Sequence, residues 1–242
     1  MKTYKGVILL FMTGLIILIY PHVAQFVNQL IQENEVSNFH AFVDNLTEEE
    51  IDSIMEQADK CNENIYYNED GFRDPFGTQQ EKLSAFNECL SDGTTMEAHE
   101  FSHEDAFSAL EIPKLQLVIP IYLGSSEDNL RRGVGQVEGS SLPLGGESTH
   151  TVLAGHRGMG TKAMFRNIDE LDDGDVFYIH TMDETLTYEV FRQQVIYPDQ
   201  TDDLEIVENK DLATLLTCHP YRHNYQRLLI HAERKIDESF NK

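Results

Sequence analysis

Two hydrophobic patterns divide the chain. Residues 7–20 form a near-continuous apolar run without a charged residue, preceded by Lys2 and Lys5. From residue 112 onward the apolar residues fall instead into short runs separated by turn-forming residues, which is the pattern of β-strands. The stretch between them carries apolar residues at helical spacing. The chain therefore predicts a membrane-type segment, a helical region and a β-rich body, in that order.

The apolar run is typical of a signal peptide or an uncleaved signal anchor. It is shorter than the roughly 20 residues that a full span needs, and residues 21–27 extend it. The nearest candidate for a cleavage site has His22 where a small residue is preferred. We expect an uncleaved anchor with the lysines in the cytoplasm and the chain from about residue 28 outside. A buried core helix is disfavoured behind two lysines at the N-terminus.

The helical region is predicted over residues 36–60. Thr47 followed by Glu50 forms a capping box, which indicates two short helices that meet near Asn45. Residues 68–78 are rich in turn formers, and Pro75 there disfavours helix at the preceding residue. Residues 79–90 resume helical spacing, and residues 91–105 predict a polar loop.

The β-rich body predicts many short strands with one or two helices between them, which favours a closed or nearly closed β-barrel. The predicted strands are 115–122, 150–155, 175–180, 186–197, 212–218 and 227–233. A short helix is expected over residues 161–171. Its inner face is expected to carry Ala163, Met164, Phe165, Ile168 and Leu171.

Composition narrows the function. The 242 residues include 42 acidic and 18 basic ones, and the net charge of −24 argues against a nucleic-acid binder. With 40% hydrophobic residues, the chain can form a sizeable core. Three cysteines are too few for a disulfide scaffold. The spacing of Cys61 and Cys89 leaves their pairing open, and Cys218 stands alone.

The last two predicted strands carry a thiol and a guanidinium that could act together in a reaction. Cys218 ends one strand and Arg227 begins the next, with eight residues between them. If the strands pair as antiparallel neighbours, the thiol and the guanidinium lie side by side. A cation beside a thiol favours the nucleophilic thiolate, and a guanidinium suits a developing oxyanion.

His156 is the best-placed partner for such a thiol. It follows an apolar strand in a glycine-rich loop, and a Cys–His pair serves as nucleophile and acid. The alternative is an inert core thiol at Cys218 with a surface charge at Arg227. A zinc site is a further reading of His219, His223 and His231. Their spacing is irregular and Pro220 lies among them, so no metal is expected.

The region 214–234, TLLTCHPYRHNYQRLLIHAER, resembles the TLxTC…R signature that ends sortase domains. Residues 112–158 resemble the segment that leads to the sortase histidine, and 195–218 resembles the pilus-assembling class C of Gram-positive bacteria. The spacings of 62 positions from His156 to Cys218 and of 9 from Cys218 to Arg227 agree with it. The resemblance covers roughly residues 36–235. It implies a mainly β fold with helical additions: an eight-stranded sortase-type barrel preceded by N-terminal helices and a lid loop.

The resemblance also implies roles for single residues. Cys218 would be the nucleophile, His156 the general acid and base, and Arg227 the group that stabilises the substrate carbonyl or the oxyanion. Asp74-Pro75-Phe76 matches the Asp-Pro-aromatic motif of the class C lid. Asp74 would pair with Arg227 and Phe76 would pack over the thiol. Outside this context the motif would read as an ordinary Asp-Pro turn.

Some residues depart from the class C pattern. After the cysteine, His219 and Arg222 stand where Thr and Gly are usual. In the loop after the histidine, Gly158 is followed by Met159-Gly160 where Leu-Pro is usual. The C-terminus is polar, where class C enzymes usually carry a second hydrophobic segment. We expect an intact catalytic triad with an altered substrate pocket.

The implied function is that of a membrane-anchored cysteine transpeptidase without metal or cofactor. It would cleave an LPXTG-like sorting signal through a thioester and join it to a pilin lysine. The expected partners are pilin subunits and the plasma membrane, with the catalytic domain outside the cell and no nucleic acid. One alternative is a housekeeping or accessory sortase that uses the cell-wall precursor as acceptor. A non-enzymatic alternative is an acidic membrane-anchored binding module.

The domain limits follow from these readings. We expect the cytoplasmic tip and anchor at 1–27, the helical region with the lid (about 70–80) at 28–110, the catalytic barrel at 111–235 and a polar tail at 236–242.

Overall fold

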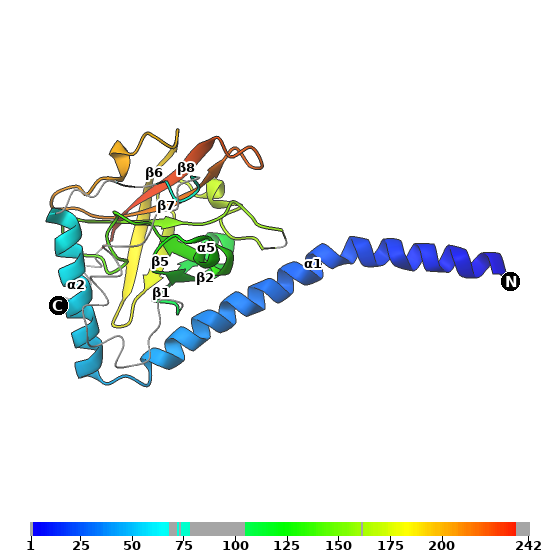
Figure 1. The fold of residues 1–242 in the computed structure, drawn as a ribbon, viewed down its shortest axis with the longest axis horizontal. Coiled ribbons are helices and arrows are strands. Elements are labelled where there is room, and N and C mark those ends of the chain that lie inside the picture. Colours follow the sequence, from blue (N-terminus) through cyan, green and yellow to red (C-terminus); the bar gives the residue numbers. More distant parts are fainter. Residues whose placement is uncertain (1, 68–71, 73, 78–104, 161, 236–242) are drawn as a thin grey trace.

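The structure, a computed structural model, describes residues 2–67, 72, 74–77, 105–160 and 162–235. In this part of the chain eight strands close into a barrel in the order β1-β2-β3-β4-β7-β8-β6-β5. Figure 1 shows helix α2 along one side of the barrel, while α1 passes beneath it and extends away toward the N-terminus. The predicted mainly β fold with N-terminal helices is confirmed.

All six predicted strands are present, with ends within two residues of the prediction. The strands are β1 Ser108–Ile112, β2 Leu117–Tyr122, β3 Val134–Gln136, β4 Thr149–Ala154, β5 Val176–His180, β6 Thr185–Ile196, β7 Asp211–His219 and β8 Gln226–Arg234. The short helices between them are α5 Glu127–Arg132, η1 Pro113–Leu115, η2 Ile168–Glu170 and η3 Asp202–Leu204. The sequence missed β1, β3 and α5, because segments of three to six residues carry too little periodicity to recognise.

The helix expected over 161–171 is wrong. The described residues of this segment form turns and the 3-10 helix η2, and Met164 has a φ of 46°, which a right-handed helix does not allow. The expected inner face is largely right, since Met164, Phe165, Ile168 and Leu171 are buried. Ala163 is exposed. These side chains anchor an irregular segment in the core.

The barrel interior holds the main core. Leu215 on β7 and Leu228 and Ile230 on β8 point into it, with the large rings of Phe177 and Tyr188. Because side chains alternate between the faces of a strand, Cys218 and its second neighbours along β7 point to the outer face. The outer face of β7 and β8 is therefore where a site can form.

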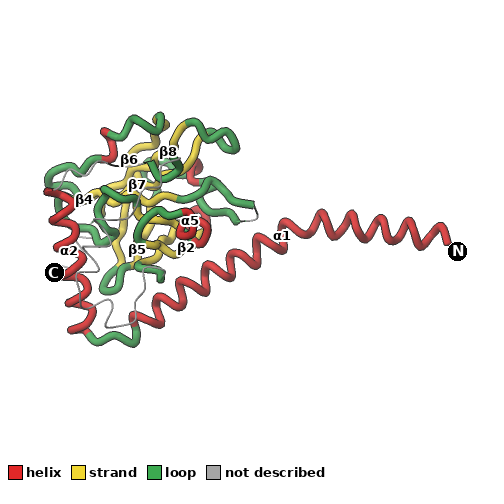
Figure 2. The backbone as a smooth tube through the Cα atoms, viewed as in Figure 1, coloured by secondary structure: helices red, strands yellow, loops and turns green. Residues whose placement is uncertain are grey.

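Among the residues that the structure describes, two helices precede the barrel. The sequence predicted two short helices meeting near Asn45; the break is there, but α1, Lys2–Val43, is one long helix that includes the apolar run. Figure 2 shows α1 as one continuous helix. Helix α2, Glu48–Tyr67, begins at the predicted capping box, where Thr47 N–H donates to Glu50 at 2.7 Å and Glu50 N–H donates to the Thr47 hydroxyl at 3.3 Å.

Helix α1 has two distinct halves. Its first half is apolar and exposed, and Tyr4–Val43 is long and apolar enough to cross a membrane. Toward its end, Val36 and Phe39 are buried, and Phe39 belongs to a cluster with Ile54 and Ala58 of α2 and Leu123 after β2. The same helix therefore joins the apolar segment to the body of the protein.

Some predictions concern residues outside the described part of the chain. Cys61 on α2 is buried and disulfide-bonded. Cys89 lies outside the described residues, and so do the helix predicted at 79–90, almost all of the loop predicted at 91–105, and the tail at 236–242.

Candidate active site

Cys218 and Arg227 lie opposite each other on neighbouring strands. Strands β7 and β8 pair antiparallel, and Cys218 is the register partner of Arg227. Both residues are buried, at 8% and 5% exposure. The thiol and the guanidinium therefore share the outer face of the barrel at one end of the two strands, as the sequence predicts.

His156 reaches the same end of the barrel through a parallel pairing. Strand β4 runs parallel to β7, and Ala154 pairs with Leu216. Two residues further on, the chains reach His156 and Cys218, so the two side chains lie at the same level of the sheet. The residue before His156 must be a glycine, because a Cβ at Gly155 would lie 2.7 Å from the Phe165 ring. The structure thus brings His156, Cys218 and Arg227 together.

The lid residues lie directly on this group. Asp74 accepts two hydrogen bonds from Arg227, at 2.7 Å from Nε and 2.6 Å from Nη2. The Phe76 ring lies 5.8 Å from the His156 ring, and the Arg227 guanidinium carbon lies 5.4 Å from the Phe76 ring centre. The lid therefore neutralises the arginine and covers its neighbours.

The surroundings keep both reactive groups uncharged while the lid is in place. Burial raises the pKa of the Cys218 thiol to about 11, against the opposing effect of Arg227. The Asp74 carboxylate raises this pKa further, and Arg157 lowers it. Burial also lowers the pKa of His156. At neutral pH the pair is thus a thiol and a neutral imidazole.

Arg157 is a functional candidate that the sequence reading missed. Its buried side chain forms an ion pair with Asp169 at 2.7 Å. It also donates to His219 Nδ1 at 2.7 Å. Since a guanidinium only donates, His219 must accept through an unprotonated Nδ1. Arg157 thereby ties the loop after His156 to the residue after Cys218; its position next to the histidine was the available signal.

An apolar surface leads away from the thiol. The outer face of β4, β7 and β8, with residues from α5, β6, η3 and the turn after β3, forms one apolar cluster against which Phe72 and Phe76 of the lid pack. Its buried members are Leu130, Val137, Val152, Ala154, Ile196, Leu204, Leu216 and Leu229. This surface suits the apolar residues of a bound peptide, and the lid occupies it.

Of the three histidines considered for zinc, His223 is exposed in the connection between β7 and β8, and the other two have partners within the protein. His219 binds Arg157, and His231 binds the Thr214 hydroxyl through Nδ1 at 2.9 Å. Within the described ranges, no group of three or more His, Cys, Asp or Glu side chains is arranged to hold a metal ion.

Comparison with known proteins identifies the family. The sortase domain profile matches residues 110–235, which is just over half of the chain. The chain belongs to the sortase family. Among curated proteins, sortase D of Bacillus subtilis is 33% identical over 116 residues, or 48% of this chain and 56% of that protein. The chain therefore spans little more than half the length of this relative.

Solved structures of class C sortases match this sortase over most of its length. Streptococcus pneumoniae sortase C, whose structure is described in terms of catalysis and pilin substrate specificity, is 33% identical. Its TM-score is 0.71, over 84% of this chain and 96% of that one. Clostridium perfringens sortase C, solved with the C-terminal cell wall sorting motif, is 37% identical with a TM-score of 0.68, over 84% and 98% of the two chains.

Proposed function

We propose that this sortase is a membrane-anchored class C transpeptidase that joins proteins bearing an LPXTG-like sorting signal to a pilin lysine. The observation that carries the proposal is the Asp74–Arg227 ion pair, with Phe76 against His156. A lid that neutralises the substrate-binding arginine is the feature that the resemblance to pilus-assembling sortases implies.

The chemistry proposed for the site is acyl transfer through a thioester. His156 takes the proton of Cys218, and Sγ attacks the threonine carbonyl of the sorting signal. Arg227 donates to the oxygen that becomes negative. The tetrahedral intermediate collapses as His156 protonates the departing glycine amine, which leaves a Cys218 thioester. The lysine amine then attacks, His156 takes its proton, and the free thiol and an isopeptide bond result.

The lid must move before this reaction can begin. In the closed form Asp74 occupies the Arg227 donors that the substrate would use, and Phe72 and Phe76 cover the apolar cluster. Opening also exposes the thiol to water, which removes the main cause of its raised pKa. Lid opening therefore both admits the substrate and activates the nucleophile.

The N-terminal helix supports the proposed location. The first half of α1 is apolar and exposed, as a membrane anchor requires, and its second half packs on the barrel. With Lys2 and Lys5 on the cytoplasmic side, the barrel stands at the outer face of the plasma membrane of a Gram-positive cell. Substrates that emerge through the membrane would meet the enzyme there.

The test is the intact mass of the full chain in detergent after incubation with an LPXTG peptide. We expect an acyl adduct with a double variant that carries Asp74→Ala and Phe76→Ala, and none when Cys218→Ala is added. A Cys218 that is inert both to the peptide and to a small thiol reagent in the open-lid variant would leave the binding-module alternative.

The acceptor is tested in the same assay. We expect the adduct to be discharged faster by a pilin-derived lysine peptide than by an amine from a cell-wall precursor. The opposite preference would favour the housekeeping or accessory alternative. The free thiol is regenerated in both cases, so the product mass identifies the acceptor.

A further inference from the structure

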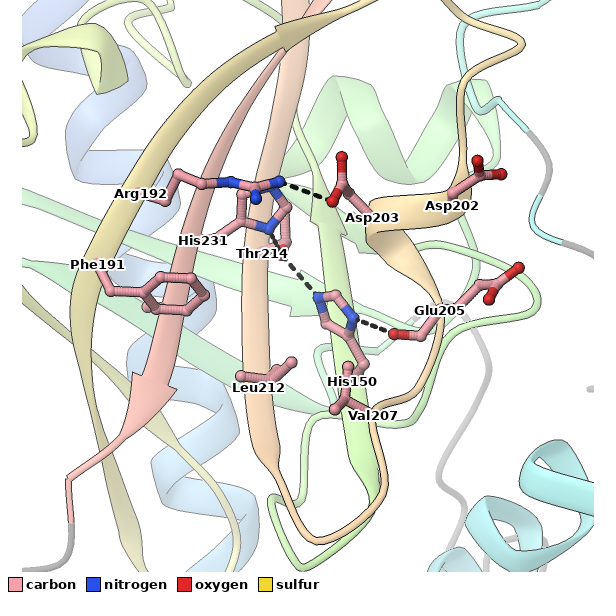
Figure 3. A pocket seen from close by; sticks show the side chains of 11 residues that line it. His150, Phe191, Arg192, Asp202, Asp203, Glu205, Val207, Leu212, Thr214 and His231 are labelled. Atoms are coloured by element: carbon pink, nitrogen blue, oxygen red, sulfur yellow. Dashed lines mark hydrogen bonds and ion pairs between the residues drawn. The ribbon is translucent and has the colours of Figure 1, made fainter.

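A cavity lies on the same outer face as the candidate active site. Its volume is about 210 Å³, and it lies between strands β4, β6, β7 and β8 and the segment that joins β6 to β7 (Figure 3). Thr214 on its floor stands four residues before Cys218 on β7, on the same side of the strand. The apolar cluster under the lid lies between the two. The cavity thus continues the surface that starts at the thiol.

A chain of hydrogen bonds fixes the protons at the cavity floor. His150 Nδ1 lies 2.8 Å from the Glu205 carbonyl oxygen, which can only accept, so Nδ1 carries the hydrogen. Burial lowers the pKa of His150, which keeps the ring neutral. Its Nε2, 2.7 Å from the Thr214 hydroxyl, is therefore an acceptor, and Thr214 donates its single hydrogen to it.

The same reasoning sets the state of His231. Its Nδ1 lies 2.9 Å from the Thr214 oxygen, whose hydrogen is already used, so His231 Nδ1 must donate. Burial, assisted by Arg192, lowers the pKa of His231 to about 4, and the ring is neutral at physiological pH. His231 Nε2 consequently carries a lone pair and no hydrogen. This atom is buried and has no hydrogen-bond partner among the described residues.

A buried acceptor without a partner costs free energy, so the cavity is suited to a hydrogen-bond donor. His231 is only 4% exposed, and the Phe191 ring stacks on it with the ring centres 6.1 Å apart. Phe191 and Val207 are about half exposed at the rim and offer apolar contacts.

Charge in and around the cavity disfavours an ionic ligand. Asp203 is already paired with Arg192 at 2.8 Å. Figure 3 shows the Asp202 and Glu205 carboxylates directed away from His231. Arg192, the register partner of His231, repels a cationic group close to it. The fitting ligand is therefore an uncharged side chain with both a donor and an apolar part.

The position of the cavity indicates which part of a substrate reaches it. After Cys218 the chain enters the exposed residues 221–225. The part of the peptide that precedes the acylated threonine is therefore expected to lie over the apolar cluster, along β7 from Cys218 toward Thr214. From Cys218 to Thr214 the strand covers about 13 Å, at about 3.3 Å per residue. An extended peptide spans that distance in about four residues. Counted back from the acylated threonine, the fourth residue is the one immediately before the LPXTG-like motif.

We propose that the cavity around His231 is a specificity subsite for the residue that immediately precedes the sorting motif, and that it takes an uncharged hydrogen-bond donor such as Thr, Asn or Gln. The inference rests on the proposed function, because it places a sorting signal on the enzyme. His231 Nε2 has almost no accessible surface in this structure, so the side chains around it, including the stacked Phe191 ring, must shift before Nε2 can accept the hydrogen bond. Phe191 and Val207 contact the apolar part of the side chain.

The experiment compares two peptides that differ only before the motif, Thr-LPXTG and Val-LPXTG, which have nearly the same shape. The enzyme is the full chain with Asp74→Ala and Phe76→Ala, and the readout is kcat/KM for formation of the Cys218 thioester. We expect the Thr peptide to react about three- to tenfold faster, the ratio that one hydrogen bond supports. His231→Phe should abolish the ratio, whereas His180→Phe on β5 should keep it.

The possible results distinguish a failure of the subsite from a failure of the proposed function. Equal rates for the two peptides, in an enzyme that is acylated by both, would overturn the subsite and leave the cavity to water. Acylation by neither peptide would overturn the proposed function and the inference with it. If His231→Phe does not fold, the ¹⁵Nε2 resonance of His231 replaces it. That signal should move with the Thr peptide and stay in place with the Val peptide, and no movement with either would overturn the subsite.

Discussion

Arg227 and Asp74 form a two-point ion pair whose side chains are only 5% and 14% exposed. Arg227 is also the register partner of Cys218, so a cation beside the thiol is neutralised by the lid. The charge at the thiol thus depends on where the lid lies. In the proposed reaction, the same contact would keep Arg227 from the substrate, and it helps to keep the Cys218 thiol protonated.

Replacing Asp74 should open the site. Asp74→Ala leaves Arg227 without its partner and weakens the hold of the lid, and we expect modification of Cys218 by a small thiol reagent to become at least about tenfold faster, as a weakening of the closed state by about 1.4 kcal/mol implies. Asp199→Ala, in an exposed turn, is the matched control and should react like the unmodified protein. An unchanged rate in Asp74→Ala would mean that the ion pair does not hold the lid.

The pH dependence of thiol reactivity should report the same change. With the lid closed, the thiolate fraction rises only toward pH 11, because burial and Asp74 both raise the pKa of Cys218. In Asp74→Ala we expect the midpoint to move to lower pH, since the thiol gains water and Arg227 is no longer neutralised. The measurement is the rate of alkylation by iodoacetamide between pH 6 and pH 10. Coincident profiles would contradict the role of the lid in holding the thiol neutral.

Arg157 should be a positioning residue for the catalytic pair. Arg157→Met removes the bonds to Asp169 and His219 that connect the two loops, and we expect a loss of about tenfold or more in kcat with KM little changed. Arg157→Lys keeps the charge but cannot bind both partners at once, so it should recover only part of the rate. Arg222→Met, exposed in the β7–β8 connection, is the control. A rise in KM with normal kcat would instead indicate a role in substrate binding.

His231 should make the fold sensitive to acid. Its folded pKa of about 4 lies below the ordinary value of 6.5, so the unfolded state binds more protons between these two pH values. Stability is therefore complete above pH 6.5 and falls as the pH drops toward 4, by on the order of 3 kcal/mol from this residue. The loss should be smaller in His231→Gln than in the control His223→Gln, when urea unfolding is compared at pH 7 and pH 4.5. Equal losses in the two variants would contradict the assignment.

Much of the candidate site follows from chain order. A strand that ends in Cys218 and a next strand that begins with Arg227 need only a hairpin-like pairing to become neighbours, and they have it. His156 joins them because β4 and β7 run parallel, which the sequence did not indicate but which its position at a strand end permits. Local sequence patterns were enough to predict these three residues because each of them lies at or just beyond the end of a strand.

Other features come from tertiary structure alone. The link from Arg157 to Asp169 and His219 depends on an irregular segment that the sequence predicted as a helix. The cavity at His231 depends on the register shift in β6 between Val190 and Arg192, which brings Phe191 and Arg192 beside β8. Neither has a periodic signal, since each depends on residues that are distant in sequence.

Pro21 lies inside α1, between the exposed apolar half and the half that packs on the barrel. Proline lacks the N–H that would continue the helical hydrogen bonds, so the helix is easiest to bend there. From Pro21 to Val36, the first strongly buried apolar residue, the helix rises about 22 Å at about 1.5 Å per residue. If the apolar half lies in a membrane, as proposed, bending at Pro21 would change both the tilt of the barrel and its height above the membrane, within a reach of about 22 Å.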